Sequence, residues 1–148
     1  MKIKILIALI LPLLFLGCDM NDLFDEGDVR KTFDDIPQVE FKPLQQEVSA
    51  ASGQATVAVQ LIAPQRDSDL AVNFSVGGNS TAQAGVHYSI STPSPVTIAA
   101  GTSSVDVVIE LIPGSVTDGP VDLYLNLEGG TGVPAAPNLD ESRTIIQP

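Results

Sequence analysis

The chain has 148 residues, 18 of them acidic and 7 basic, which give a formal net charge of −11 at pH 7. Phosphate backbones and anionic lipid surfaces are bound by clusters of Lys and Arg. This charge therefore excludes nucleic-acid binding and argues against adhesion of the protein body to anionic lipid. A single Cys excludes an internal disulfide bond, and one His with no Trp leaves few side chains for catalysis or for stacking against sugar rings.

The N-terminal residues have the layout of a secretory signal peptide. Lys2 and Lys4 form a short positive region, and an apolar run of about a dozen residues follows from residue 5 to residue 16. This run is shorter than the roughly 20 apolar residues that a membrane-spanning helix needs, and Pro12 weakens a helix within it. The segment therefore predicts export rather than a transmembrane helix.

A four-residue motif, Phe15-Leu16-Gly17-Cys18, ends the apolar run. It resembles the lipobox of bacterial lipoproteins, in which a small residue precedes a cysteine that is diacylated on sulfur and becomes the new N-terminus. The resemblance implies that residues 1–17 are a lipoprotein signal peptide and that Cys18 is the lipidation site. Each buried CH₂ group contributes ~0.8 kcal/mol, so two or three acyl chains would make release from the membrane slow. The alternatives are an ordinary signal peptide followed by a free thiol, and a buried core cysteine.

Residues 18–37 are predicted to be the lipidated Cys followed by an acidic, flexible tether. Seven of the 18 acidic residues lie in this segment, and its apolar residues follow no sustained period. A flexible chain of this length has a root-mean-square reach of roughly 25 Å, so the folded domain is expected to stand off the bilayer. Acidic residues after the cysteine resemble the surface-export signals of Bacteroidota lipoproteins, whereas Asp beside it means inner-membrane retention in enteric bacteria. We expect a lipid-anchored protein of the bacterial cell envelope, on the surface or the periplasmic face of the outer membrane.

Residues 38–148 alternate between apolar and polar side chains, which predicts half-buried strands and no helix. In one such run Val107 and Ile109 fall on one face, while Asp106 and Glu110 fall on the other. Seven strands are predicted, at residues 39–49, 54–62, 70–76, 87–98, 103–111, 121–128 and 142–147. Gly, Pro, Asn and Asp residues separate them and are typical of turns. This pattern predicts one all-β domain, an immunoglobulin-like seven-stranded antiparallel sandwich.

A series of motifs within this domain resembles the Calx-β signature. Thr81-Ala82 precedes Gly85-Val86-His87-Tyr88, and a strand that closes at Ala100-Gly101 follows. The family pattern has Thr-Ala, then Gly-x-Asp-Tyr, then a strand ending in Pro-Gly-Glu or a variant, and the similarity covers residues 45–127. The resemblance implies an immunoglobulin-like sandwich of seven strands, and a likeness to Bacteroidota lipoproteins that carry Calx-β-like domains.

The same resemblance makes calcium a candidate ligand, because Calx-β domains of sodium–calcium exchangers bind Ca²⁺ through acidic residues at one end of the sandwich. Glu47 and Asp118 match or lie near acidic positions of that family. His87 stands where the signature has Asp, and Val121 stands at a second glutamate position. Because Ca²⁺ takes about 6–8 oxygen ligands, two carboxylates predict at most a weak site. We therefore expect no cofactor, with calcium as the alternative.

Three other groups have a structural interpretation. His87 lacks the second His or Cys that a zinc site needs, so it is expected to be a polar residue at a strand edge. Gly129-Gly130-Thr131-Gly132 is expected to be a loop rather than a phosphate-binding loop, because no Lys follows it. Asp67 and Asp69 lie in a turn, where solvated charge is the usual explanation.

These observations predict a non-enzymatic, lipid-anchored module of the cell envelope with a structural or protein-binding role. No nucleophile with a base and no pair of catalytic acids is suggested, so we expect no enzyme. The alternatives are a glycan-binding accessory lipoprotein of an uptake system, for which Tyr88 and Tyr124 would form a stacking face, and a weak calcium-binding domain. The expected partners are the membrane, through the lipidated N-terminus, and an envelope protein or glycan.

Overall fold

The structure is a computed structural model and describes residues 35–148. In this part of the chain, segments of alternating apolar and polar residues form strands that turns and loops separate. Cys18, the signal peptide and most of the tether lie outside the described residues, so their assignments stay predictions. In the described part, the helical element is the short 3-10 turn η2 (Ala50–Ser52), and no helix there is long and apolar enough to cross a membrane.

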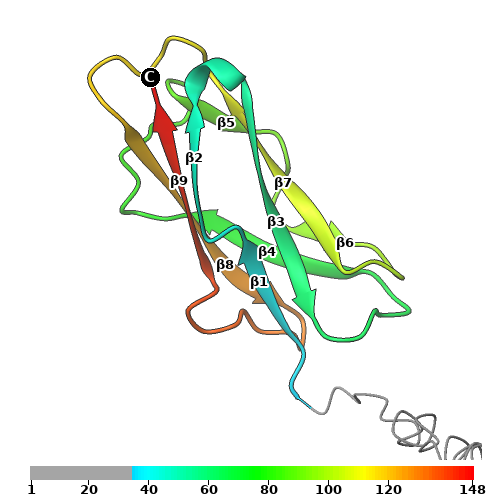
Figure 1. The fold of residues 1–148 in the computed structure, drawn as a ribbon. Coiled ribbons are helices and arrows are strands. Elements are labelled where there is room, and N and C mark those ends of the chain that lie inside the picture. The colour runs from blue at the N-terminus through cyan, green and yellow to red at the C-terminus, as the bar shows by residue number, and fades with distance from the viewer. Residues whose placement is uncertain (1–34) are drawn as a thin grey trace, which may run out of the picture. The chain divides into compact units, whose positions relative to one another are not determined.

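The strands form two sheets that lie face to face (Figure 1). Four strands make one sheet in the order β1 (Gln38–Lys42), β3 (Gln54–Ile62), β7 (Ser104–Leu111) and β5 (Tyr88–Ile90). Five make the other in the order β2 (Gln45–Ser49), β9 (Glu141–Gln147), β8 (Val121–Gly130), β4 (Leu70–Val76) and β6 (Val96–Ile98). The predicted immunoglobulin-like sandwich is confirmed. However, residues 35–148 hold nine strands rather than seven, and β2 and β9 pair in parallel.

The first predicted strand, residues 39–49, is in fact two strands in different sheets. β1 pairs with β3, and β2 pairs with β9 in the opposite sheet. Pro43 separates them, because a proline has no N–H to donate to a ladder. The inward-facing positions also change phase, since Phe41 is buried in β1 whereas Gln46 and Val48 are the less exposed residues of β2. An uninterrupted strand would instead have placed Glu47 on the same face as Phe41.

The fourth predicted strand, residues 87–98, also divides between the sheets. β5 pairs with β7, and β6 pairs with β4. Pro93 and Pro95 interrupt the segment between them, and the Thr92 hydroxyl replaces a ladder partner by accepting a hydrogen bond of 2.9 Å from the Val108 N–H. His87 lies in the turn before β5 rather than in a strand.

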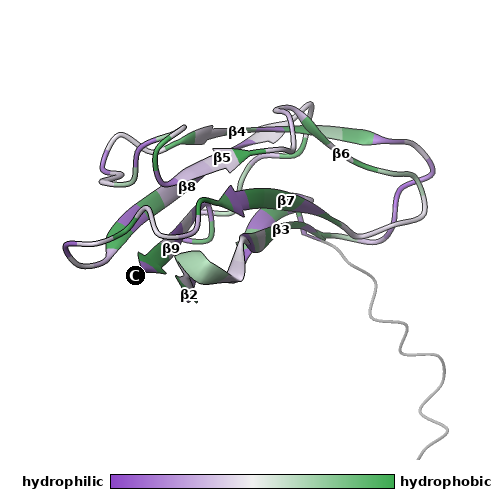
Figure 2. Ribbon diagram, turned by 90° about the horizontal axis from the view of Figure 1, so that it is seen from above, coloured by the Kyte–Doolittle hydropathy of each residue, from purple (hydrophilic) through white to green (hydrophobic). Residues whose placement is uncertain are grey.

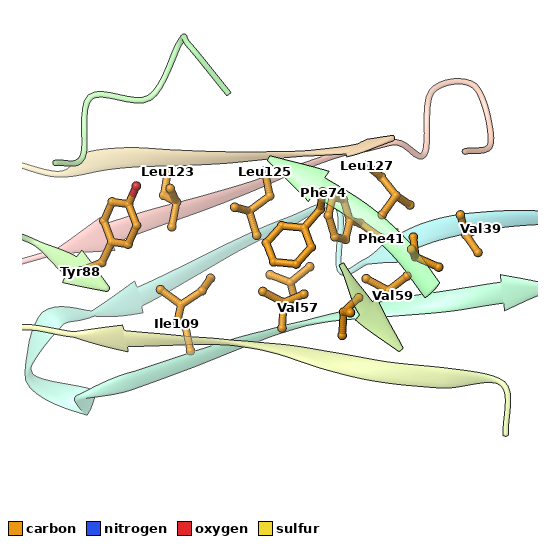
Figure 3. Packing of buried hydrophobic residues seen from close by; sticks show 14 of the residues in the cluster. Val39, Phe41, Val57, Val59, Phe74, Tyr88, Ile109, Leu123, Leu125 and Leu127 are labelled. Carbon is orange, nitrogen blue, oxygen red and sulfur yellow. The ribbon is translucent and has the colours of Figure 1, made fainter. Parts of the chain in front are cut away.

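Aliphatic and aromatic side chains from both sheets meet between the layers (Figure 3). The strands carry hydrophilic and hydrophobic residues in turn along their length (Figure 2), and the predicted inward faces are buried in β3, β7 and β8. The largest fully buried side chains include Phe41, Ile109, Leu123, Leu125 and Ile146. Val76 continues the alternation of Val72 and Phe74 but is 43% exposed, so the core contribution of β4 ends at Phe74.

Candidate interaction surface

The outer face of the five-stranded sheet carries the polar side chains of β8 and β9. Leu123 and Leu125 of β8 point into the core, so the intervening Asp122 and Tyr124 face outward. The antiparallel register places Arg143 of β9 directly opposite Tyr124. Residues opposite each other in such a pair have Cβ atoms about 5 Å apart, so their side chains interact.

Arg143 makes a two-pronged ion pair with Asp122 on this face. Its Nε donates to Asp122 Oδ1 at 3.1 Å and its Nη2 donates to Oδ2 at 2.8 Å. The guanidinium carbon lies 5.7 Å from the centre of the Tyr124 ring, a cation–π distance. The hydrogen bond to Asp122 raises the pKa of Arg143. The Arg143 charge is thus already matched by a carboxylate, and part of the Tyr124 ring face is covered.

A hollow of about 650 Å³ lies beside this pair. It is lined by Leu44, Asn126, Asn138, Asp140 and Glu141. The Arg143 N–H donates to the Leu44 carbonyl at 2.8 Å, so the segment between β1 and β2 is fixed at its rim. Amides and carboxylates can bind hydroxyl and amino groups, and this lining has no Ser, Thr, Cys, Lys or His side chain.

A smaller hollow, of about 280 Å³, is lined by three residues singled out from the sequence, His87, Asp118 and Val121. His87 Nδ1 accepts a hydrogen bond of 2.9 Å from the Gln83 N–H, so this nitrogen closes a local turn. Glu47, the other calcium candidate, is not among the lining residues, and its carboxylate accepts from Gln147 Nε2 at 3.3 Å. Within residues 35–148 no three His, Cys, Asp or Glu side chains gather as metal ligands would. Glu47 and Asp118 therefore lack the further acidic ligands with which a strong calcium site is built.

The remaining sequence candidates have structural roles. Asp69 Oδ1 accepts a hydrogen bond of 2.8 Å from the Ala100 N–H and so holds the turn before β7. Gly129 and Gly130 end β8 rather than forming a loop, and a β-carbon on Gly130 would lie 2.4 Å from the Ala71 carbonyl oxygen. The close approach of two backbones explains this glycine.

Tyr88 and Tyr124 do not form the common stacking face that the glycan-binding alternative requires. Tyr88 is only 3% exposed and packs in the core near Leu123 (Figure 3), and this burial raises the pKa of its hydroxyl. Tyr124 faces solvent on the outside of the five-stranded sheet. The two rings therefore lie on opposite sides of that sheet.

Solved structures resemble this fold at low sequence identity. The crystal structure of the apo-form Calx CBD1 domain matches with a TM-score of 0.64 and 19% identity, over 76% of this chain and 97% of that one. The fold is Calx-β-like. The calcium binding domain CBD12 of CALX1.1 matches with a TM-score of 0.62 and 20% identity, over 74% of this chain and 44% of that one.

A periplasmic chaperone is also similar to this Calx-β-like sandwich. The periplasmic chaperone SfaE matches with a TM-score of 0.51 and 12% identity, over 74% of this chain and 57% of that one. No protein-family model and no curated protein matches the chain. At these identities the similarities show the fold alone.

The pairing of Arg143 with Asp122 was not predicted from the sequence. Alternation in residues 121–128 places Asp122 and Tyr124 outward, and that is the available signal. The position of Arg143 depends on the register between β8 and β9, two strands that the loop of residues 131–140 joins. Sequence periodicity alone does not specify the register of two strands joined by a long loop.

Proposed function

We propose that this protein is a non-enzymatic, lipid-anchored module of the bacterial cell envelope, held on the outer membrane and acting by binding another protein. The observation that carries the proposal is the Phe15-Leu16-Gly17-Cys18 motif at the end of an apolar signal segment. The acidic residues that follow would separate the Calx-β-like domain from the bilayer. Lipidation of Cys18 would then place the sandwich next to envelope partners.

The exposed side chains favour a protein partner over a glycan. Carbohydrate sites commonly use exposed aromatic rings, which offer a flat apolar face with polar edges. Of the four aromatic residues in the described part of the chain, Phe41, Phe74 and Tyr88 are buried. The fourth, Tyr124, has the Arg143 guanidinium beside its ring. A polar, acidic surface of this kind suits hydrogen bonding and charge pairing with a polypeptide.

Metabolic labelling with an alkyne fatty acid tests the anchor. The unmodified protein should carry label and sediment with membranes, whereas Cys18→Ala should lose the label and leave the membrane fraction, because no acyl chain remains. Asn21→Ala is the matched control, since it changes a neighbouring residue outside the motif. Unchanged membrane association of Cys18→Ala would overturn the proposed anchoring.

Protease treatment of intact cells tests the placement. A domain held on the outer surface should be digested before lysis, whereas one on the periplasmic face should be digested only after the outer membrane is opened. Separation of the inner and outer membranes from untreated cells gives a second measurement. Recovery of the protein with the inner membrane would contradict the proposed outer-membrane location.

A further inference from the structure

The sandwich has four edge strands, β1, β5, β2 and β6, and three of them are blocked by a loop, a turn, a short length or a proline. An edge strand exposes a row of unpaired N–H and C=O groups to which another chain can add. At β1 the loop before β9 covers this row. The Val39 N–H donates to Pro134 O at 3.0 Å and the Phe41 N–H donates to Leu139 O at 2.9 Å. This edge is therefore already hydrogen-bonded.

The edges at β5 and β6 are also protected, because each strand has only three residues. In β5 the Tyr88 carbonyl already accepts a hydrogen bond of 2.7 Å from the Gly85 N–H. In β6 the strand begins directly after Pro95, which has no N–H to offer. Short strands and prolines are common ways to block the addition of a further strand.

The outer edge of β2 is open. β2 and β9 form a parallel ladder, in which the Arg143 N–H donates to the Leu44 carbonyl at 2.8 Å. Because alternate residues of a strand bond to the same neighbour, the backbone groups of Gln46 and Val48 also face β9. The N–H and C=O groups of Gln45 and Glu47 consequently point away from the sheet. Within residues 35–148 these four groups have no backbone partner.

The open edge is also held in place before any partner binds. Gln46 Nε2 donates to Thr144 Oγ1 at 3.0 Å in the same sheet and to the Thr56 carbonyl at 3.1 Å in the opposite sheet. The side chain therefore joins β2 to both layers of the sandwich. A preformed edge lowers the ordering cost of adding a strand.

We propose that the β2 edge binds an extended segment of a partner protein that carries Lys or Arg beside Glu47. This inference deepens the protein-binding role proposed above. The segment would add as a sixth strand and hydrogen-bond to Gln45 and Glu47. The described domain has twelve acidic residues against three basic ones, Lys42, Arg66 and Arg143, and Arg143 is matched by Asp122. Charge complementarity therefore specifies a cationic strand.

A second copy of this chain fits the edge less well. Pairing of β2 with β2 of another copy would bring the two Glu47 carboxylates opposite or diagonal to each other on one face. Like charges at these positions destabilise a strand pair. Glu47 would therefore oppose self-association while favouring a cationic segment.

The position of the C-terminus allows the edge to be tested within one chain. The Pro148 carbonyl accepts a hydrogen bond of 3.2 Å from Ser49 Oγ, so the chain ends beside the end of β2. A flexible Gly/Ser linker of about eight residues followed by the strand Thr-Val-Lys-Val-Thr-Val could turn back along β2 at millimolar effective concentration. Hydrogen exchange of the Gln45 and Glu47 amides, measured on the full chain in detergent, reports whether it does.

The expected result is exchange at Gln45 and Glu47 about tenfold slower with the Lys strand than with a control extension that has Pro at alternate positions. Replacing Lys by Glu in the added strand should remove most of this protection, and Glu47→Lys should restore it. The free Lys-strand peptide, added at millimolar concentration to the unmodified chain, should slow the same two amides, and this second measurement requires no change to the fold.

Equal exchange with the Lys and Pro extensions, and no effect of the free peptide, would overturn the proposed edge. Equal protection by the Lys and Glu strands would overturn the cationic assignment. Protection of the unmodified chain that grows with protein concentration would identify a second copy as the occupant. None of these outcomes depends on acylation, so failure here and failure of the Cys18→Ala experiment are distinguishable.

Discussion

Phe41→Ala should strongly destabilise the domain, because Phe41 anchors β1, the first strand of the described residues. Phe41 is 1% exposed and belongs to the core that both sheets form (Figure 3). Truncation of a buried Phe to Ala costs about 3–5 kcal/mol in the free energy of unfolding. With an unfolding entropy near 2.1 cal/mol/K per residue over about 110 residues, the melting temperature should fall by roughly 13–22 °C.

Thermal unfolding of the two proteins, followed by circular dichroism, measures this shift. Lys42→Ala is the matched control, since Lys42 is the next residue of β1 and its side chain is exposed. That change should move the melting temperature by no more than about 2 °C, in line with an effect within ~0.5 kcal/mol at a surface site. A shift of similar size for both variants would mean that β1 is not packed as the structure shows.

Three further predictions concern the end of β8, the core and calcium. Gly130→Ala should cost about 1–3 kcal/mol, because its β-carbon would lie 2.4 Å from Ala71 O, whereas Gly78→Ala, with open space around it, should be neutral in the same denaturant titration. Burial raises the pKa of the Tyr88 hydroxyl in the folded state. The stability that the buried neutral Tyr88 contributes is therefore fully present below pH 10.0, the usual pKa of tyrosine, and is lost as the pH rises above it. Melting at pH 8 and above pH 10 should show a smaller alkaline loss for Tyr88→Phe, and an equal loss would refute the assignment. Millimolar Ca²⁺ should produce no heat in calorimetry, and a saturable signal would contradict the described donor set.

The interruptions of the strands show where sequence patterns were sufficient and where they were not. Alternation correctly predicted that Val107 and Ile109 lie inside and that Asp106 lies outside. It did not show that residues 39–49 cross from one sheet to the other, although Pro43 and the change of phase after it were visible in the sequence. Single-strand periodicity does not specify which neighbour a strand pairs with.

The same limit of sequence periodicity applies to the candidate surface on β8 and β9. The outward positions of Asp122 and Tyr124 followed from the sequence, whereas the ion pair with Arg143 required the β8–β9 register. The calcium hypothesis rested on the two carboxylates of Glu47 and Asp118, which would form at most a weak site, and a stronger site would need further acids beside them. In the described residues they do not form such a group.

By itself, the sequence determined the all-β class, the alternating core and the acidic surface, because each depends on local composition and a period of two residues. It also supplied the lipobox-like motif on which the proposed anchor rests. Only the tertiary structure decided that β1 and β2 lie in different sheets and that the β2 edge stays open. The physical reason is that strand pairing joins residues far apart in the chain, such as Glu47 and Ile145, and local sequence carries little information about that choice.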